Sequence, residues 1–103
     1  MDFPRGNPTQ VLVAIMWLVL FSDEARRDLS RLDASIRTQV VNRITRLSEQ
    51  FDRITHLPLH NDLKGFFKLR VSDWRVAYTF EPQDKIIRIR EIKHRSKIYK
   101  RRG

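Results

Sequence analysis

The chain has 103 residues, with 21 Lys and Arg side chains against 12 Asp and Glu, so its formal charge is +9. This length allows one hydrophobic core, and a 41% hydrophobic share is enough to build it, which argues against several domains and against intrinsic disorder. No cysteine is present, which excludes disulfides, thiol nucleophiles and Cys-ligated zinc and favours a cytoplasmic protein. His56 and His60 flank Pro58, so no helix brings them together, and we expect no metal.

An apolar run of 11 residues, VLVAIMWLVLF, covers positions 11–21. It is too short to span a bilayer, and no small-residue cleavage pattern follows it, so it predicts a buried strand rather than a secretory signal. A chain that began at Met16 would start with this strand and lead directly into a helix. We therefore expect residues 1–15 to be an N-terminal extension upstream of the native start, and residues 16–103 to form the domain.

Two helices are predicted next. Ser22 is a suitable N-cap, with two acidic residues in the turn that follows and an apolar stripe at Ala25, Leu29 and Leu32. A second, longer helix begins with Asp33 or Ser35 as its cap. Its apolar positions recur every three or four residues and are Ile36, Val40, Ile44, Leu47 and Phe51. Together they predict a helical hairpin.

Three segments with alternating polarity follow, at residues 66–71, 74–80 and 86–92. Turns at Ser72-Asp73 and at Pro82-Gln83-Asp84 would join them into an antiparallel meander. The predicted fold class is α+β: an N-terminal strand, a helical hairpin and a three-stranded meander, forming a small sheet with helices on one face.

A two-residue turn at Ser72-Asp73 fixes the pairing of the first hairpin. Arg70 then lies opposite Arg75, and Lys68 lies opposite Ala77, on the face away from the core. Like charges at opposed positions are destabilising, so their presence suggests a surface that binds an anion, although both side chains could also extend into water at little cost.

The positive charge is concentrated at the C-terminus. Residues 85–103 hold nine Lys and Arg side chains and one acid, Glu91, whereas residues 1–84 are nearly neutral. Basic residues alternate with isoleucines there, which is typical of a strand with one charged face. Such a face indicates either a surface that meets phosphates or a solvated edge strand protected against aggregation. The run has no amphipathic basic helix, so we expect no membrane partner.

Several segments together resemble the RelE toxins of the RelE/ParE superfamily. They are LKGFFKLRVSDWRVAYTF, the ending IKHRSKIYKR with its HRxxxY pattern, and the opening MWLVLFSDEARRDLSRL. The resemblance covers residues 16 to about 102. It implies a type II toxin that cleaves mRNA in the ribosomal A site without a metal or another cofactor and so inhibits translation. It also implies a RelB-like antitoxin that neutralises the toxin in a heteromeric complex.

The resemblance also implies the site residues. Lys68, Arg75, Arg95 and Tyr99 match catalytic positions: the two arginines would hold the scissile phosphate, and Lys68 would act as the general base. Tyr99 would stack on a base or transfer a proton, unless it closes the core. Positions expected to bind substrate or ribosomal RNA are Arg70, Lys93, His94, Arg88 and Arg90. Two departures concern Phe66, where relatives carry a lysine, and Lys93, near a place where some carry arginine.

Two alternatives remain from the sequence. A ParE-like toxin would share the fold but inhibit DNA gyrase and cut no RNA. A basic RNA-binding module without catalysis would use aromatic residues of the sheet for stacking, but Trp74 and Tyr78 fall on the predicted core face.

Overall fold

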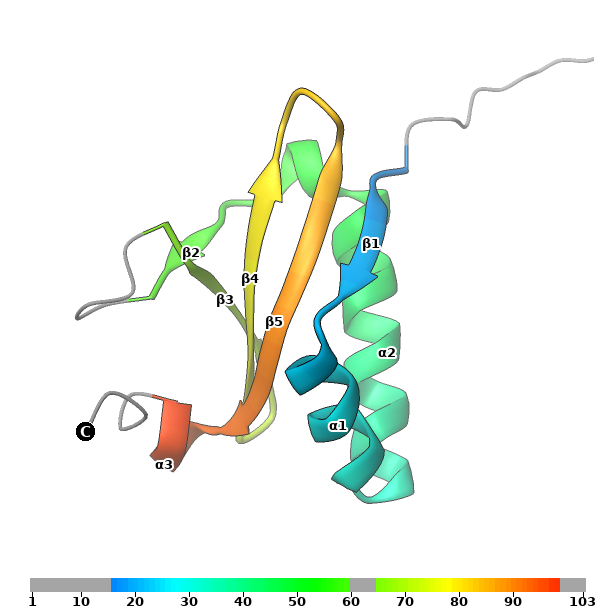
Figure 1. Cartoon of the computed structure of the whole chain (residues 1–103), viewed down its shortest axis with the longest axis vertical. Helices are drawn as coiled ribbons and strands as arrows, with labels where there is room; N and C mark the ends of the chain where they lie inside the picture. Colours follow the sequence, from blue (N-terminus) through cyan, green and yellow to red (C-terminus); the bar gives the residue numbers. More distant parts are fainter. Residues whose placement is uncertain (1–15, 60–64, 99–103) are drawn as a thin grey trace, which may run out of the picture.

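The computed structural model describes residues 16–59 and 65–98. Within these ranges a five-stranded sheet is combined with helices (Figure 1). In chain order the elements are β1 (Leu18–Phe21), α1 (Asp23–Arg31), α2 (Ala34–Glu49), the 3-10 helix η2 (Phe51–Arg53), β2 (Leu57–Pro58), β3 (Phe67–Val71), β4 (Trp74–Glu81), β5 (Ile86–His94) and α3 (Arg95–Ile98). The predicted α+β class, the helical hairpin and the three-stranded meander are confirmed.

The strand order is β1-β5-β4-β3-β2, and only β1 runs parallel to its neighbour, β5. The predicted register of the β3–β4 hairpin is confirmed at all five pairs, from Val71 opposite Trp74 to Phe67 opposite Tyr78. Ser72, in the turn, has a φ of 57°, and Lys85 has a φ of 53° in the turn between β4 and β5. This second turn therefore extends one residue beyond the predicted Pro82-Gln83-Asp84.

The helices begin where their caps predict. The Ser22 hydroxyl accepts a hydrogen bond from the Ala25 backbone N–H at 3.0 Å, which satisfies one of the free donors of the first turn of α1. Asp33 is the N-cap of α2 by position, but its side chain makes no capping bond. Phe51 was expected in the second helix; α2 ends at Glu49, and Phe51 belongs to η2 while remaining in the core.

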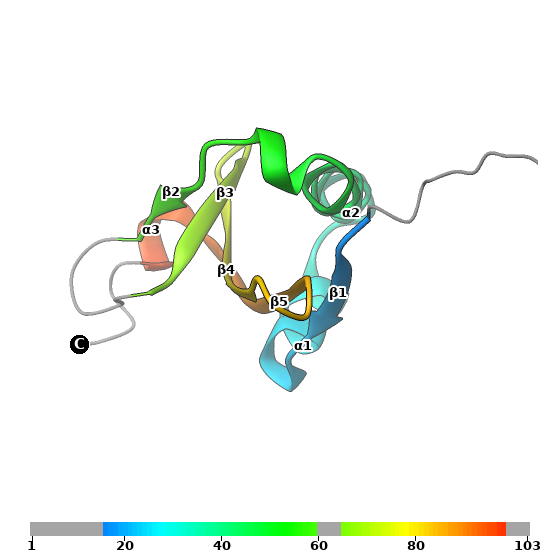
Figure 2. The ribbon, with the colours of Figure 1, turned by 90° about the horizontal axis from the view of Figure 1, so that it is seen from above.

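One face of the sheet packs against α2, and the short helix α3 lies on the opposite face, as the view from above shows (Figure 2). The core between the sheet and α2 contains buried Val40, Ile44 and Leu47 from the helix. From the sheet it contains Val71, Val76, Tyr78, Ile87, Ile89 and Ile92. Aromatic rings fill one end of this core: the rings of Trp17 and Phe51 pack against each other at a tilt of 32°, with centroids 4.1 Å apart.

The N-terminal strand is shorter and more exposed than predicted. Within the described part of residues 11–21, the strand covers only Leu18–Phe21, at the edge of the sheet, and Leu18 is 56% exposed. An edge strand with helices over one face turns only alternate side chains toward the core, and here Val19 and Phe21 are the half-buried ones. The strand β2 and the helix α3 were not predicted, because two and four residues carry no periodicity. None of the described helices is both long and apolar enough to cross a membrane.

Candidate functional site

Three basic residues form one line across the sheet. The register places Arg70 of β3 opposite Arg75 of β4, and Arg75 opposite Lys93 of β5. Their chain neighbours Val71 and Ile92 are buried in the core, so the alternation of side chains along a strand places this basic row on the opposite face. The predicted opposition of Arg70 and Arg75 is therefore confirmed, and Lys93 extends it to a third strand.

Arg75 is held by the backbone of the adjacent turn. Its Nη1 donates to the carbonyl oxygens of Ser72 at 3.0 Å and Trp74 at 2.8 Å. In the described part of the chain neither Arg70 nor Arg75 pairs with a carboxylate. Two guanidinium groups without acidic partners, one of them fixed by carbonyl groups, can bind a phosphate through charge-assisted hydrogen bonds.

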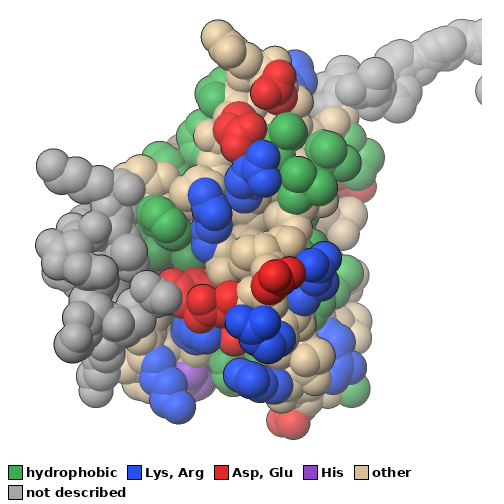
Figure 3. Space-filling model, viewed as in Figure 1, with side chains coloured by type: hydrophobic (Ala, Val, Ile, Leu, Met, Phe, Trp, Pro, Cys, Tyr) green, Lys and Arg blue, Asp and Glu red, His purple; other side chains and the backbone are tan. Residues whose placement is uncertain are grey.

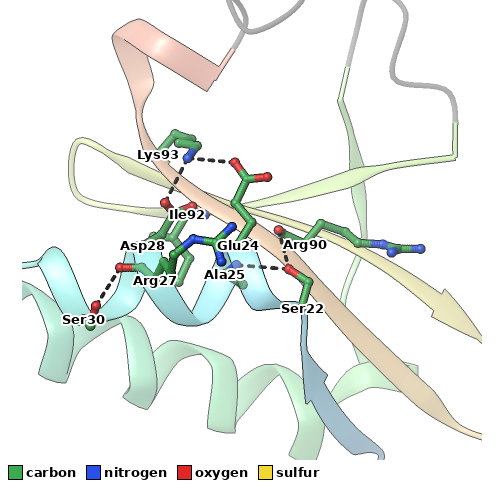
Figure 4. A network of polar contacts seen from close by, with 9 residues as sticks. All are labelled: Ser22, Glu24, Ala25, Arg27, Asp28, Ser30, Arg90, Ile92 and Lys93. Atoms are coloured by element: carbon green, nitrogen blue, oxygen red, sulfur yellow. Dashed lines mark hydrogen bonds and ion pairs between the residues drawn. The ribbon is translucent and has the colours of Figure 1, made fainter.

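Lys93 differs from the two arginines because acids already neutralise it. Its Nζ lies 2.9 Å from Oε2 of Glu24 and 2.9 Å from Oδ1 of Asp28, both on α1 (Figure 4). Partial burial alone would lower the pKa of Lys93, but the hydrogen bonds and charges of the two carboxylates outweigh it and raise the pKa above its usual value. A substrate phosphate would therefore compete with Glu24 and Asp28 for this ammonium group.

Lys68 lies two residues before Arg70 on β3 and belongs to a second line of residues across the sheet. The register places it opposite Ala77, and Ala77 opposite Glu91. Glu91 is only 3% exposed, and Ala77 is buried with Leu59 and Ile98 in a small cluster. The helix α3 therefore covers part of the face that carries the basic row. Tyr99, which follows α3, lies outside the described residues.

Arg88 and Arg90 lie nearer the start of β5 than Lys93, and both side chains have polar partners. Arg88 Nε pairs with Glu81 at 2.5 Å; this hydrogen bond lowers the pKa of the Glu81 carboxyl and raises that of the Arg88 guanidinium. Arg90 Nε donates to the Thr79 hydroxyl at 3.1 Å, and its guanidinium lies 5.8 Å from the centre of the Phe66 ring. These predicted substrate-binding residues are thus separate from the basic row.

His94 ends β5, and Arg95 begins α3. The backbone N–H of Arg95 donates to the Asp73 carbonyl at 2.7 Å, and its Nε lies 3.7 Å from the Asp73 carboxylate. Arg75 and Arg95 are therefore both bound to residues of the β3–β4 turn. His94 pairs with Trp74 on the opposite face from the basic row, with ring centroids 5.5 Å apart.

The sequence reasoning missed the acidic partners of this basic surface. Glu24 and Asp28 are four residues apart, a spacing that places both on one face of a helix, and this signal was available. Their pairing with Lys93 depends on the position of α1 beside β5, which the sequence does not indicate. Among the described residues no group of three or more acidic or histidine side chains could hold a metal ion.

Comparison with known proteins gives a consistent result. The model of the family described as the ParE toxin of the type II toxin-antitoxin system parDE matches residues 19–99. No curated protein matches the sequence. A chain of the toxin-antitoxin complex RelBE2 from Mycobacterium tuberculosis is similar at 30% identity, with a TM-score of 0.70, over 80% of this chain and 94% of that one.

Two further solved structures share the fold at lower identity. The archaeal RelE-RelB complex from Pyrococcus horikoshii matches at 21% identity and a TM-score of 0.64, covering 80% of this chain and 98% of that chain. The isolated RelE toxin of E. coli matches at 16% identity and a TM-score of 0.65, covering 84% of this chain and 94% of that chain. Since the family model matches most of its length, this chain belongs to the ParE toxin family, within the RelE/ParE superfamily of type II toxin-antitoxin toxins.

Proposed function

We propose that this toxin is a ribosome-dependent endoribonuclease that cleaves mRNA in the A site and is neutralised by a cognate antitoxin. The observation that carries the proposal is the pair Arg70 and Arg75, opposed on the sheet face without a carboxylate partner among the described residues. A purely structural sheet would avoid this repulsion, whereas an RNA phosphate between the two side chains would relieve it.

The reaction needs a base, a group that stabilises the charge on the phosphorus and a proton donor for the leaving oxygen. A base takes the proton of a ribose 2′-hydroxyl, the 2′-oxygen attacks the adjacent phosphorus, and the bond to the 5′-oxygen breaks as that oxygen receives a proton. The products are a 2′,3′-cyclic phosphate and a free 5′-hydroxyl. Arg75 and Arg95, which both bind residues of the β3–β4 turn, would stabilise the charge on the pentavalent phosphorus. We assign the base to Lys68, one step along the sheet, and a base-stacking or proton-transfer role to Tyr99.

The partner of this toxin in the proposal is a RelB-like protein. Two of the similar structures are described as complexes of a toxin with its antitoxin, RelBE2 and RelE-RelB. The basic row and the flanking cations of β5 offer an acidic partner a complementary surface. Figure 3 shows several Lys and Arg side chains over the lower half of the molecule, with Asp and Glu side chains among them, where Figure 1 places α1, the end of β5 and α3.

A second candidate function is inhibition of DNA gyrase, because the matching family carries the ParE description. In that case the sheet face would bind a protein and not RNA. The neutralised state of Lys93 favours this reading, since a cation already held by two carboxylates contributes less to a phosphate site.

The deciding experiment maps cleavage sites by primer extension on a reporter mRNA in a translating extract, with a gyrase supercoiling assay in parallel. Wild type is expected to cut within the translated region only when ribosomes are engaged. Arg75→Ala is expected to lower the rate about 100-fold, the usual loss when one donor to a developing charge is removed. Arg43→Ala, an exposed arginine on α2, is the matched control. Intact mRNA with arrested supercoiling would establish the gyrase function instead.

A further inference from the structure

A second basic site lies at the end of the sheet and shares Lys93 with the basic row. A pocket of about 250 Å³ opens between the end of α1, the start of β4, the end of β5 and α3. Its walls include Arg31, Trp74, Lys93, His94 and Lys97, together with Asp28. Four of these side chains are cations or a histidine and one is a tryptophan, a combination typical of single-stranded nucleic-acid sites.

Two aromatic rings form one wall of the pocket. The rings of Trp74 and His94 meet nearly perpendicularly, at 85°, with centroids 5.5 Å apart. Trp74 is half-buried, so its ring is anchored by the core while part of it remains accessible. An unstacked base could lie against such a wall, since every base presents a flat aromatic surface.

The orientation of His94 is fixed from α3. The backbone N–H of Ser96 donates to His94 Nδ1 at 3.2 Å, and the Ser96 hydroxyl lies 2.9 Å from the same nitrogen. Because Nδ1 accepts a hydrogen bond from a backbone donor, the neutral ring carries its proton on Nε2. The Nε2–H is thus available to donate to a base or a phosphate.

The free charge of the pocket comes from its rim. Lys93 and Asp28 pair with each other at 2.9 Å, so they nearly cancel. Arg31 and Lys97 are exposed, and in the part of the chain that the structure describes neither has an acidic partner. Two unpaired cations beside an aromatic wall suit a phosphate and its base better than they suit an apolar ligand.

We propose that this pocket binds one nucleotide of single-stranded RNA beyond the scissile phosphate, with its base against Trp74 and His94 and its phosphate on Arg31 and Lys97. The inference rests on the proposed function and deepens it, by adding a subsite that positions the message. The volume is below the roughly 300 Å³ at which pockets for whole ligands begin, so it suits one base. A duplex would not enter, because its bases remain stacked.

The test measures binding without cleavage. A fluorescein-labelled RNA hexanucleotide with 2′-O-methyl riboses lacks the attacking hydroxyl, and fluorescence anisotropy gives its Kd for the full chain. Arg31→Ala/Lys97→Ala is expected to raise the Kd about tenfold and to reduce the salt slope by about 1.4, at about 0.7 for each single-strand phosphate contact. Arg43→Ala/Arg46→Ala on α2 removes the same charge elsewhere and is expected to change the Kd less than about twofold.

A second measurement examines the base. Binding is expected to quench tryptophan fluorescence, and the quenching should be lost in Trp74→Phe, which keeps an aromatic ring in the core. A hexanucleotide with an abasic central position should bind wild type more weakly and lose its sensitivity to Trp74→Phe.

Each remaining outcome is decisive. Equal losses of RNA affinity in the two double variants would mean that only the overall charge matters, and would overturn the proposed nucleotide site. If the binding of an acidic peptide, poly-glutamate, depended on Arg31 and Lys97 while the binding of the RNA did not, the pocket would be assigned to a protein partner. If wild type leaves mRNA intact in the extract but binds the hexanucleotide through the pocket, the proposed function fails and the pocket stands. If it cuts mRNA and the pocket variants bind normally, only the pocket fails.

Discussion

Asp28 of α1 binds the backbone of Ile92 in β5: its Oδ2 accepts the Ile92 N–H at 2.9 Å, and its side chain is 6% exposed. The parallel strand β1 pairs with β5 only as far as Ile89. Ser22, the next residue after β1, donates its backbone N–H to the Ile89 carbonyl at 2.9 Å and its hydroxyl to the Arg90 carbonyl at 2.7 Å. Ser22 and Asp28 therefore form hydrogen bonds with backbone groups of β5 at the positions where β1 no longer pairs with it. Asp28 also forms an ion pair with Lys93.

This double role predicts a graded effect on stability. Asp28→Ala leaves the buried Ile92 backbone N–H without an acceptor and removes one of the two carboxylates that hold Lys93, and we expect it to lower the free energy of unfolding by about 3 kcal/mol. Asp28→Asn keeps an acceptor for Ile92 and loses only the charge, so about half of that loss is expected. Urea unfolding of both variants checks this. Equal losses would mean that the bond to Ile92 contributes nothing.

The ion pairs of Lys93 predict a dependence on alkaline pH. The folded-state pKa of Lys93 is raised above the ordinary 10.5, so its stabilising contribution is fully present below that value and is lost as the pH rises through the folded pKa. The difference in unfolding free energy between wild type and Lys93→Met should therefore stay constant from neutral pH to about pH 10 and shrink above it. If the difference in unfolding free energy between wild type and Lys93→Met grew above about pH 10, the ion pairs assigned to Lys93 would be contradicted.

The opposed arginines predict opposite effects on stability and activity. Arg70→Gln removes the repulsion from Arg75, and we expect it to raise the free energy of unfolding by about 0.5 kcal/mol, more at low salt. Cleavage of mRNA should fall about tenfold, because one charge-assisted contact to phosphate is lost. Arg43→Gln should change neither. If Arg70→Gln stabilised the protein and left cleavage unchanged, Arg70 would have no part in the reaction.

A buried hydrogen-bonded pair predicts a loss of stability with no loss of function. The hydroxyl of Tyr78, which is 1% exposed, lies 2.7 Å from His56 Nδ1, while His56 Nε2 donates to the Phe51 carbonyl at 3.0 Å. Burial raises the pKa of Tyr78 far above its usual value, so the phenol stays a donor at any ordinary pH. Tyr78→Phe leaves Nδ1 unpaired and should cost about 1 to 2 kcal/mol in urea unfolding.

A double-mutant cycle checks that this loss belongs to the pair. Tyr78→Phe in a His56→Leu background should cost less than in wild type, because the acceptor has already been removed. Additive losses would place the effect in packing around the aromatic cluster instead.

Local signals in the sequence predicted much of the fold. The Ser22 cap, the apolar spacing from Ile36 to Leu47, and the alternation on both sides of Ser72-Asp73 all act between near neighbours in the chain. A two-residue turn sets the hairpin register by itself, so the opposition of Arg70 and Arg75 followed directly. The short elements β2 and α3 carry too few residues for such a signal.

The sequence by itself therefore determined the class of fold, the core face of the hairpin and the basic character of the opposite face. Only the tertiary structure decided that β1 lies parallel to β5, that α1 continues along its edge, and that Glu24 and Asp28 reach Lys93. It also placed His94 in a pocket with Arg31, more than 60 positions earlier in the chain. These contacts join residues distant in sequence, and their geometry depends on how whole elements pack, which hydrophobic periodicity does not encode.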